Sequence, residues 1–112
     1  MDENAKKTAL RMIPYGLYVL TAEDSQGRMS GATINWVTQT SFQPPLVALG
    51  VKKDSLIHDI IKESGKFALN VLGKNQQGLA YAFFKPVERD GETLGGEAFQ
   101  TGVAGCPLLD NA

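Results

Sequence analysis

The sequence predicts a mainly β protein of one domain, most simply a small antiparallel barrel. Its 112 residues, 43% of them hydrophobic, suffice for one globular core. At least four segments have the composition and alternation of strands, whereas one has a clear helical pattern and two have shorter ones. The strands and helices do not alternate regularly as in a parallel sheet, so we expect the strands to pair antiparallel.

The first part of the chain predicts a short helix followed by a hairpin. Residues 3–13 place four apolar side chains at helical spacing, and Pro14 ends that pattern. Residues 15–22 have the composition of a strand. The polar residues 23–27 are typical of a turn, and they lead into a second strand over residues 28–41. We therefore expect these two strands to pair.

The strand predicted over residues 28–41 carries more hydrogen-bonding side chains than a packed core tolerates without partners. β-branched and aromatic residues still give it strand character. The polar side chains belong to Thr33, Asn35, Thr38, Gln39, Thr40 and Ser41. This row faces either water or a polar ligand, and spacing alone does not decide between them. Trp36, in the same strand, decides little, because a tryptophan is more often a core residue than a stacking partner.

The middle of the chain predicts a buried strand followed by the clearest helix. Residues 45–51 are apolar on both alternations, so we expect both faces of this strand to be covered. From Asp54 the pattern becomes helical, with a stripe of three isoleucines. Asp54 or Ser55 is expected to cap the start of this helix, and Gly65 to lie just beyond its end.

The last part of the chain predicts another strand, a short helix and a surface loop. Residues 66–72 alternate as a strand does, and residues 76–84 have the pattern of a short helix that Pro86 ends. Residues 86–96 are charged and contain glycine, as mobile surface loops do. The glycine-containing run at residues 91–96 is not a dinucleotide-binding motif, because it neither follows a clear strand nor opens a helix.

Composition argues against several classes of partner. Eleven basic and twelve acidic residues give a net charge of −1, which argues against sequence-independent binding to nucleic acid or to an anionic membrane. One cysteine and one histidine exclude an internal disulfide and argue against a metal site. A cytoplasmic location fits this cysteine usage, and no segment is apolar enough to span a membrane. Cys106 is most simply a small buried residue, with a redox role as the alternative.

Residues 52–58 join the end of a strand to the start of a helix, where unpaired backbone amides favour an anion. Ser55 and His58 share a helical face, and Lys52 and Lys53 stand just before them. A phosphate there would receive hydroxyl, imidazole and ammonium contacts. The alternative is an ordinary capped helix with solvated lysines. No nucleophile motif accompanies His58, so an anion contact or a surface position is favoured over a general base.

Several motifs follow one another in an order that is familiar from one family. They are a strand rich in Gly, Ser and Thr, then Pro44-Pro45 with Leu46-Val47-Ala48-Leu49, then Lys53-x-Ser55, then Gly65-x-Phe67-x-x-Asn70-Val71-Leu72. From about Ile13 to Leu109 the chain resembles the flavin reductase-like, FMN-binding split-barrel family. The resemblance implies a six-stranded antiparallel split barrel of Greek-key type with a few short helices. It also implies a homodimer that holds flavin near the subunit interface, and closing strands that this chain is expected to lack.

The resemblance further implies which residues hold the flavin. In the family, the polar strand and the turn after it contact the ring, the ribityl chain and the phosphate. The matching positions here are Thr33, Asn35, Trp36, Thr38, Gln39 and Ser41, with Lys52, Lys53, Ser55 and His58 near the phosphate and Asn75 as a further contact. Many relatives have Ser or Thr where Asn35 and Trp36 stand, so contacts to the ring edge are expected to differ. No catalytic side chain is implied, because the flavin carries the chemistry.

The function implied by the resemblance is that of an NAD(P)H-dependent flavin reductase, which passes hydride from nicotinamide to flavin N5. FMN is the expected cofactor, with FAD also possible, and the electron acceptor would be a small molecule or a protein. One alternative is an FMN-containing electron-transfer module or ferric reductase that a protein partner reduces. Another is a non-catalytic β-barrel that binds a phosphorylated ligand or a protein.

Overall fold

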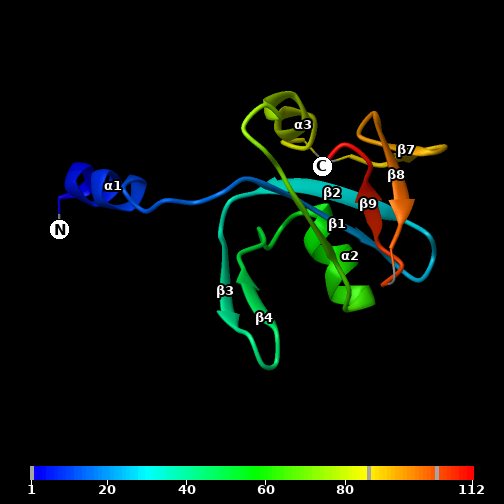
Figure 1. Cartoon of the computed structure of the whole chain (residues 1–112), viewed down its shortest axis with the longest axis horizontal. Helices are drawn as coiled ribbons and strands as arrows, with labels where there is room; N and C mark the ends of the chain where they lie inside the picture. The colour runs from blue at the N-terminus through cyan, green and yellow to red at the C-terminus, as the bar shows by residue number, and fades with distance from the viewer. Residues whose placement is uncertain (1, 86, 103) are drawn as a thin grey trace.

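The computed structural model describes residues 2–85, 87–102 and 104–112, which form antiparallel sheets with three short helices (Figure 1). The helices are α1 (Glu3–Arg11), α2 (Leu56–Ser64) and α3 (Gln77–Ala82). The strands are β1 (Tyr18–Glu23), β2 (Met29–Ile34), β3 (Val37–Ser41), β4 (Leu46–Leu49), β5 (Ala68–Val71), β6 (Arg89–Asp90), β7 (Thr93–Leu94), β8 (Glu97–Thr101) and β9 (Pro107–Leu109). Across these described residues, no helix is long and apolar enough to cross a membrane. The predicted mainly β class is confirmed.

Two sheets build the body of the molecule. β1 lies between β2 and β5 in a three-stranded sheet, with Tyr18 opposite both Ile34 and Val71. β6, β7, β8 and β9 form a second sheet in chain order, and β9 also contacts β1 and β5. β3 and β4 pair only with each other, with a shift in register between Gln39 and Ser41. The described residues thus form three separate sheets, and no closed barrel is found among them.

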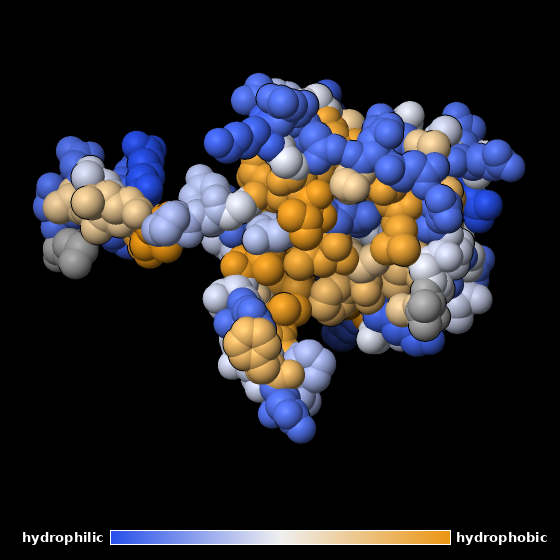
Figure 2. Space-filling view, in the orientation of Figure 1, coloured by the Kyte–Doolittle hydropathy of each residue, from blue (hydrophilic) through white to orange (hydrophobic). Residues whose placement is uncertain are grey.

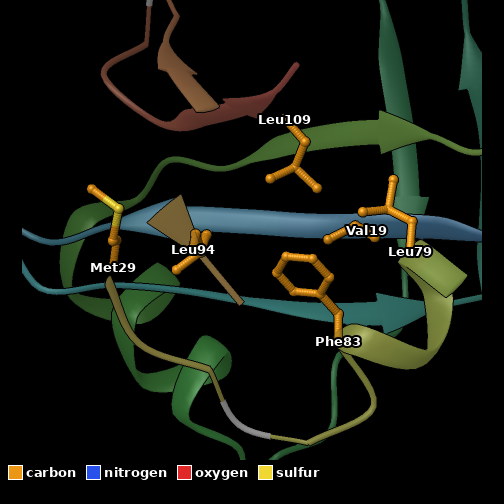
Figure 3. Close-up of a cluster of buried hydrophobic side chains, with 6 residues drawn as sticks. All are labelled: Val19, Met29, Leu79, Phe83, Leu94 and Leu109. Atoms are coloured by element: carbon orange, nitrogen blue, oxygen red, sulfur yellow. The ribbon is translucent and has the colours of Figure 1, made fainter. Parts of the chain in front are cut away.

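The alternation of β1 directs neighbouring side chains into two opposite cores. Between the two large sheets, Val19 packs with Met29, Leu79, Phe83, Leu94 and Leu109 (Figure 3). Leu20 and Ala22 face the other way and pack with Ile57 and Ile60 of α2. Consequently α2 covers one face of the central sheet, while α3 and the β6–β9 sheet cover the other.

Buried hydrogen bonds tie β9 to the central sheet. The side-chain amide of Asn70 donates to the Val19 carbonyl oxygen (2.9 Å) and to Thr21 Oγ1 (3.1 Å). Asn70 Oδ1 accepts from the Leu109 amide (2.9 Å), and Thr21 Oγ1 donates to the Pro107 carbonyl oxygen (2.5 Å). A buried polar group left without a partner costs about 1–3 kcal/mol, so these bonds fix where β9 lies.

The ends of α2 follow the local signals in the sequence. Of the two candidate caps, Ser55 is the residue that caps the helix, because its Oγ accepts from the His58 backbone amide (3.2 Å). Gly65 ends the helix in the left-handed conformation with φ 70°, which a glycine adopts without strain. The predictions of this helix, its cap and its terminating glycine are confirmed.

Two predicted segments differ from the structure. The strand expected over residues 28–41 is two strands, because β2 pairs with β1 whereas β3 pairs with β4. The surface loop expected over residues 86–96 holds the β6–β7 hairpin, whose Leu94 is fully buried. Three glycines with positive φ, at positions 91, 95 and 96, allow the tight turns on either side of β7. Pro86, expected to end the preceding helix, lies outside the described residues.

α1 and the β3–β4 hairpin project from the body of the molecule (Figure 1). Every residue of α1 is exposed, and Leu46 and Val47 of β4 expose 51% and 47% of their surface. The prediction that both faces of this strand are covered is therefore wrong for the single chain. Hydrophobic side chains lie open on both projections (Figure 2), with Met12 and Phe42 the most exposed.

Candidate functional site

A cavity of about 300 Å³ lies beside β2, the edge strand of the central sheet. Its lining comes from three segments that are far apart in the sequence: residues 30–34 of β2, residues 51, 52 and 54–57 around the start of α2, and residues 83–85 after α3. The first segment is the beginning of the predicted polar strand and contains Thr33, and the second is the lysine-containing helix start on which the flavin hypothesis depends. The fold therefore brings these two features together.

Gly31 allows the ring of Phe83 to pack directly against β2. A Cβ atom at Gly31 would lie 2.8 Å from Phe83 Cε1 and 3.3 Å from the Leu20 carbonyl oxygen, so no larger residue fits without movement. The Phe83 carbonyl oxygen accepts from the Thr33 amide (3.0 Å), and the Thr33 hydroxyl donates to the Ala80 carbonyl oxygen (2.6 Å). These contacts fasten the segment after α3 to β2 and form one wall of the cavity.

The outer edge of β2 presents backbone groups toward this wall. In an antiparallel strand, the N–H and C=O of one residue point to the same side, and the side alternates from residue to residue. Thr33 donates its amide away from β1, so Gly31, two residues earlier, presents its peptide groups at the same edge. Peptide groups at a cavity can recognise a flat ring with hydrogen-bonding atoms on its rim.

The charged side chains that line the cavity are Lys52, Asp54 and Lys85. Among the residues that the structure describes, the one ion pair joins Arg28 to Asp24 (3.2 Å), and neither of these lines the cavity. Both lysines are therefore available to an anion, and the first backbone amides of α2 add partial positive charge. Two cationic side chains against one carboxylate suit a phosphate.

Ser55 and His58 differ in their relation to this cavity. Ser55 lines it, but the Ser55 hydroxyl already donates to the Lys52 carbonyl oxygen (2.7 Å) and accepts from the His58 amide. Ser55 thus holds the loop that carries Lys52. His58 lines an adjoining hollow that shares Val51 with the cavity, and its buried Nδ1 has no hydrogen-bond partner within the described chain.

The structure divides the predicted site residues into two groups. Thr33, Lys52 and Ser55 line the cavity, and His58 lies beside it. The others lie outside its lining: Asn35, Trp36, Thr38, Gln39, Ser41, Lys53 and Asn75. Most of this second group belongs to β3 or to the link before it. Trp36 exposes 71% of its surface, so it does not take the core position that is more usual for a tryptophan.

Sequence reasoning missed Gly31, Phe84 and Lys85, and it considered Asp54 only as a helix cap. Gly31 carried a signal, since an isolated glycine within a strand indicates close approach of another group. Phe84 and Lys85 carried none, because they follow a short helix and reach the cavity only through the packing of Phe83 on β2.

Cys106 takes no part in this cavity. It is almost fully buried, as expected of a small buried residue. Burial raises the pKa of its thiol above the ordinary value, so the thiol is protonated at neutral pH.

Antiparallel sheets, with a cavity at a sheet edge whose charged lining is two lysines and one aspartate, define a small β domain. Residues 10–112 match the model of the family described as flavin reductase like domain. The chain belongs to this family. Its membership confirms the resemblance found in the order of the sequence motifs.

Relatives and solved structures agree with this assignment. A protein of Rhizobium meliloti (strain 1021) described as a probable flavin reductase is 31% identical over 110 residues, which cover 98% of this chain and 34% of that protein. The NADH-dependent flavin reductase StyB of Pseudomonas fluorescens is 31% identical over 112 residues, which cover 100% of this chain and 63% of that protein. The solved structure of the styrene monooxygenase flavin reductase from Pseudomonas putida S12 has a TM-score of 0.77 and 30% identity, over 96% of this chain and 66% of that one. The chain thus spans less than two thirds of the length of both curated relatives.

Proposed function

We propose that the cavity beside β2 binds a flavin nucleotide and that this domain serves an NAD(P)H-dependent flavin reductase. The observation that carries the proposal is the meeting of three kinds of group at one cavity: the peptide edge at Gly31, the ammonium of Lys52 and the start of α2. A flavin nucleotide offers their complements, which are a flat ring with a hydrogen-bonding rim and a phosphate. FMN fits this donor set, and so does the FMN half of FAD.

The chain's own residues bind and orient the ring. Gly31 leaves room for close approach to the backbone, and its peptide groups would hydrogen-bond to the rim of the ring. Thr33 holds the wall formed by Phe83 through its two hydrogen bonds. When bound, the flavin supplies the electron chemistry between nicotinamide and an acceptor, so no side-chain acid or base is required.

The phosphate would lie at the start of α2. Lys52 supplies a charge there, and the first amides of the helix supply donors, while Ser55 fixes the loop between them. His58, in the adjoining hollow, would contribute a further contact. Asp54 lies in the same lining and would limit how much negative charge the site accepts.

We also propose a homodimer in which the β3–β4 hairpin of one copy completes the flavin site of the other. The hairpin projects from the body and carries large exposed apolar side chains, among them Phe42, Leu46 and Val47. Its polar contacts would come from Asn35, Trp36, Thr38, Gln39 and Ser41, with Lys53 and Asn75 as outer contacts. The six-stranded split barrel and a cytoplasmic location, both expected from the sequence, belong to this proposal.

The electron acceptor is proposed to be free flavin used by a second enzyme, or a protein. The support comes from two relatives, one named as NADH-dependent and the other as the flavin reductase of a styrene monooxygenase. NADH is accordingly the first electron donor to test.

The test is a titration of the purified chain with FMN and FAD, followed by anaerobic stopped-flow mixing with NADH or NADPH. Flavin fluorescence gives the affinity, and loss of flavin absorbance gives the rate of reduction. Lys52→Ala should weaken binding of both flavins roughly 10-fold, the size expected for one charge-assisted phosphate contact. Lys74→Ala, in an exposed lysine outside the cavity, is the matched control. Absence of flavin binding, or an equal effect of both substitutions, would contradict the proposal.

A further inference from the structure

One edge of the Phe83 ring lies against two glycines that are far apart in the chain. A Cβ atom at Gly31 of β2 would lie 2.8 Å from Phe83 Cε1, and a Cβ atom at Gly95, just after β7, would lie 3.2 Å from the same carbon. The ring is almost fully buried and packs in one core with Leu94, the residue before Gly95 (Figure 3). Phe83 thus connects the end of β7 with the strand that borders the cavity.

Gly95 also lies against Val87, which forms a second attachment to β2. A Cβ atom at Gly95 would lie 3.2 Å from Val87 Cγ1. The Val87 carbonyl oxygen accepts from Ser30 Oγ (2.7 Å), and the Phe83 carbonyl oxygen accepts from the Thr33 amide (3.0 Å). Both residues that Gly95 approaches are therefore hydrogen-bonded to the strand that borders the cavity.

The turn that contains Gly95 does not by itself require a glycine there. β7 and β8 pair with Leu94 opposite Glu97, so Gly95 and Gly96 form a two-residue turn, with φ angles of 58° and 83°. Asparagine followed by glycine is a preferred pair for a turn in which both residues have positive φ. A Cβ atom at Gly96 would meet nothing within 4 Å. The close packing around Gly95, and not the turn, therefore accounts for the absence of a side chain at this position.

We propose that Gly95 is a positioning residue of the cavity, which acts through Phe83 on the peptide groups of Gly31. A side chain at Gly95 would require the Phe83 ring to move by a few tenths of an ångström. Because the ring packs on Gly31 and its backbone is bonded to Thr33, this displacement passes into β2. The inference rests on the flavin reductase function proposed above, in which the flavin ring contacts Gly31. It adds that the turn after β7 sets the geometry of the ring end of the site.

The phosphate end of the site does not depend on these contacts. Lys52 and the start of α2 belong to another segment of the lining, and α2 packs on the opposite face of the central sheet. A change at Gly95 should therefore weaken binding of the ring, whereas Lys52→Ala should weaken binding of the phosphate. Riboflavin has the ring and the ribityl chain of FMN but no phosphate, so it distinguishes the two effects.

The experiment measures dissociation constants for riboflavin and FMN by fluorescence titration. Gly95→Asn suits the turn but adds a side chain, and it should weaken binding of both ligands by the same factor, roughly 3- to 10-fold, the size of one lost hydrogen bond. Gly96→Asn adds the same side chain in open space and should bind both ligands like the wild type. Lys52→Ala should weaken the binding of FMN alone. If Gly95→Asn does not fold, Gly95→Ala and its control Gly96→Ala take the place of this pair.

Two further measurements test whether the effect passes through Phe83. In a Phe83→Leu background, Gly95→Asn should leave the riboflavin affinity nearly unchanged, because the contacted ring carbons are gone. In the protein without flavin, Gly95→Asn should speed exchange of the Thr33 amide proton more than that of the β1 amides, since the Thr33 amide donates to the Phe83 carbonyl oxygen. Gly96→Asn should not. A turn that is merely destabilised would produce neither result.

Several outcomes would overturn the inference. They are wild-type riboflavin affinity in Gly95→Asn, equal losses for Gly95→Asn and Gly96→Asn, and a loss for FMN that riboflavin does not share. An undiminished effect of Gly95→Asn in the Phe83→Leu background would overturn it as well, because the effect would then not pass through the ring.

The same measurements separate this inference from the proposed function. Wild-type protein that binds no flavin, but whose Thr33 amide responds to Gly95→Asn and not to Gly96→Asn, would refute the flavin reductase proposal alone. Protein that binds and reduces flavin with an affinity independent of Gly95 would refute the positioning role alone. Absence of both flavin binding and the amide response would refute both.

Discussion

Replacing Gly31 with alanine puts a methyl group where the edge of the Phe83 ring now packs. The new carbon would lie 2.8 Å and 2.9 Å from two ring carbons and 3.3 Å from the Leu20 carbonyl oxygen. The ring is held in its place, because it also packs close to Gly95, where a Cβ would lie 3.1 Å from Phe83 Cζ, and because the Phe83 carbonyl oxygen accepts from the Thr33 amide. The strain must therefore spread into β2 or into the cavity wall.

Overpacking of this kind costs about 1–3 kcal/mol. For a domain of this size, the melting temperature should fall by roughly 5–15 °C. Flavin affinity should fall as well, because the same atoms form one wall of the cavity. Calorimetry gives the melting temperature, and a fluorescence titration with FMN gives the flavin affinity.

Gly78→Ala is the matched control, since Gly78 lies in α3 and a Cβ there would meet nothing within 4 Å. This change should stabilise the protein by about 0.5–1 kcal/mol. In a Phe83→Leu background, the cost of Gly31→Ala should shrink, because the contacted ring carbons are gone. A Gly31→Ala protein as stable as the wild type, with unchanged flavin affinity, would refute the reasoning.

Three further predictions concern buried or capped groups. Asn70→Ala should lower the free energy of unfolding, measured in urea, by about 3 kcal/mol, because it leaves the buried partners of the side chain unpaired. The same change at the exposed Asn75 should lower it little. A loss below about 1 kcal/mol for Asn70→Ala would contradict the role of Asn70. Ser55→Ala should cost about 1 kcal/mol through loss of the helix cap, and Ser55→Asp should keep that stability while weakening FMN binding through repulsion of the phosphate. Because burial raises the thiol pKa of Cys106, iodoacetamide should label it slowly between pH 7 and pH 9 in the native protein and rapidly in urea. Rapid native labelling would show that the thiol is accessible.

Local signals predicted α2 and the strands of the central sheet, because their determinants lie within each segment. Ser55 and Gly65 define a helix through their own backbone and side-chain chemistry, and the residue composition of a strand defines β1. The break between β2 and β3 carried no such signal, since it depends on which strand each half pairs with. The burial of Leu94 likewise depends on a core assembled from distant strands.

Half of the candidate site could be predicted from local residue types in the same way. Thr33, Lys52 and Ser55 could be predicted because a polar strand and a helix start have recognisable residue types. Phe84 and Lys85 could not, because their place in the cavity is set by a ring that packs on a glycine some fifty positions earlier in the chain. The apolar pattern of β4 predicted covering on both faces, but a pattern of this kind does not identify what covers it.

The bonds of Asn70 and Thr21 also shape how the molecule opens. They join residues that lie 39 to 86 positions apart, so β9 cannot detach without stranding polar atoms inside β1 and β5. Local fluctuation of β9 is thereby suppressed, and its amide protons should exchange with solvent only when the central sheet itself comes apart. In the part of the chain that the structure describes, the side-chain hydrogen bonds of α1 and of the β3–β4 hairpin are local and exposed, so the amide protons of both segments should exchange at a lower free-energy cost than those of β9.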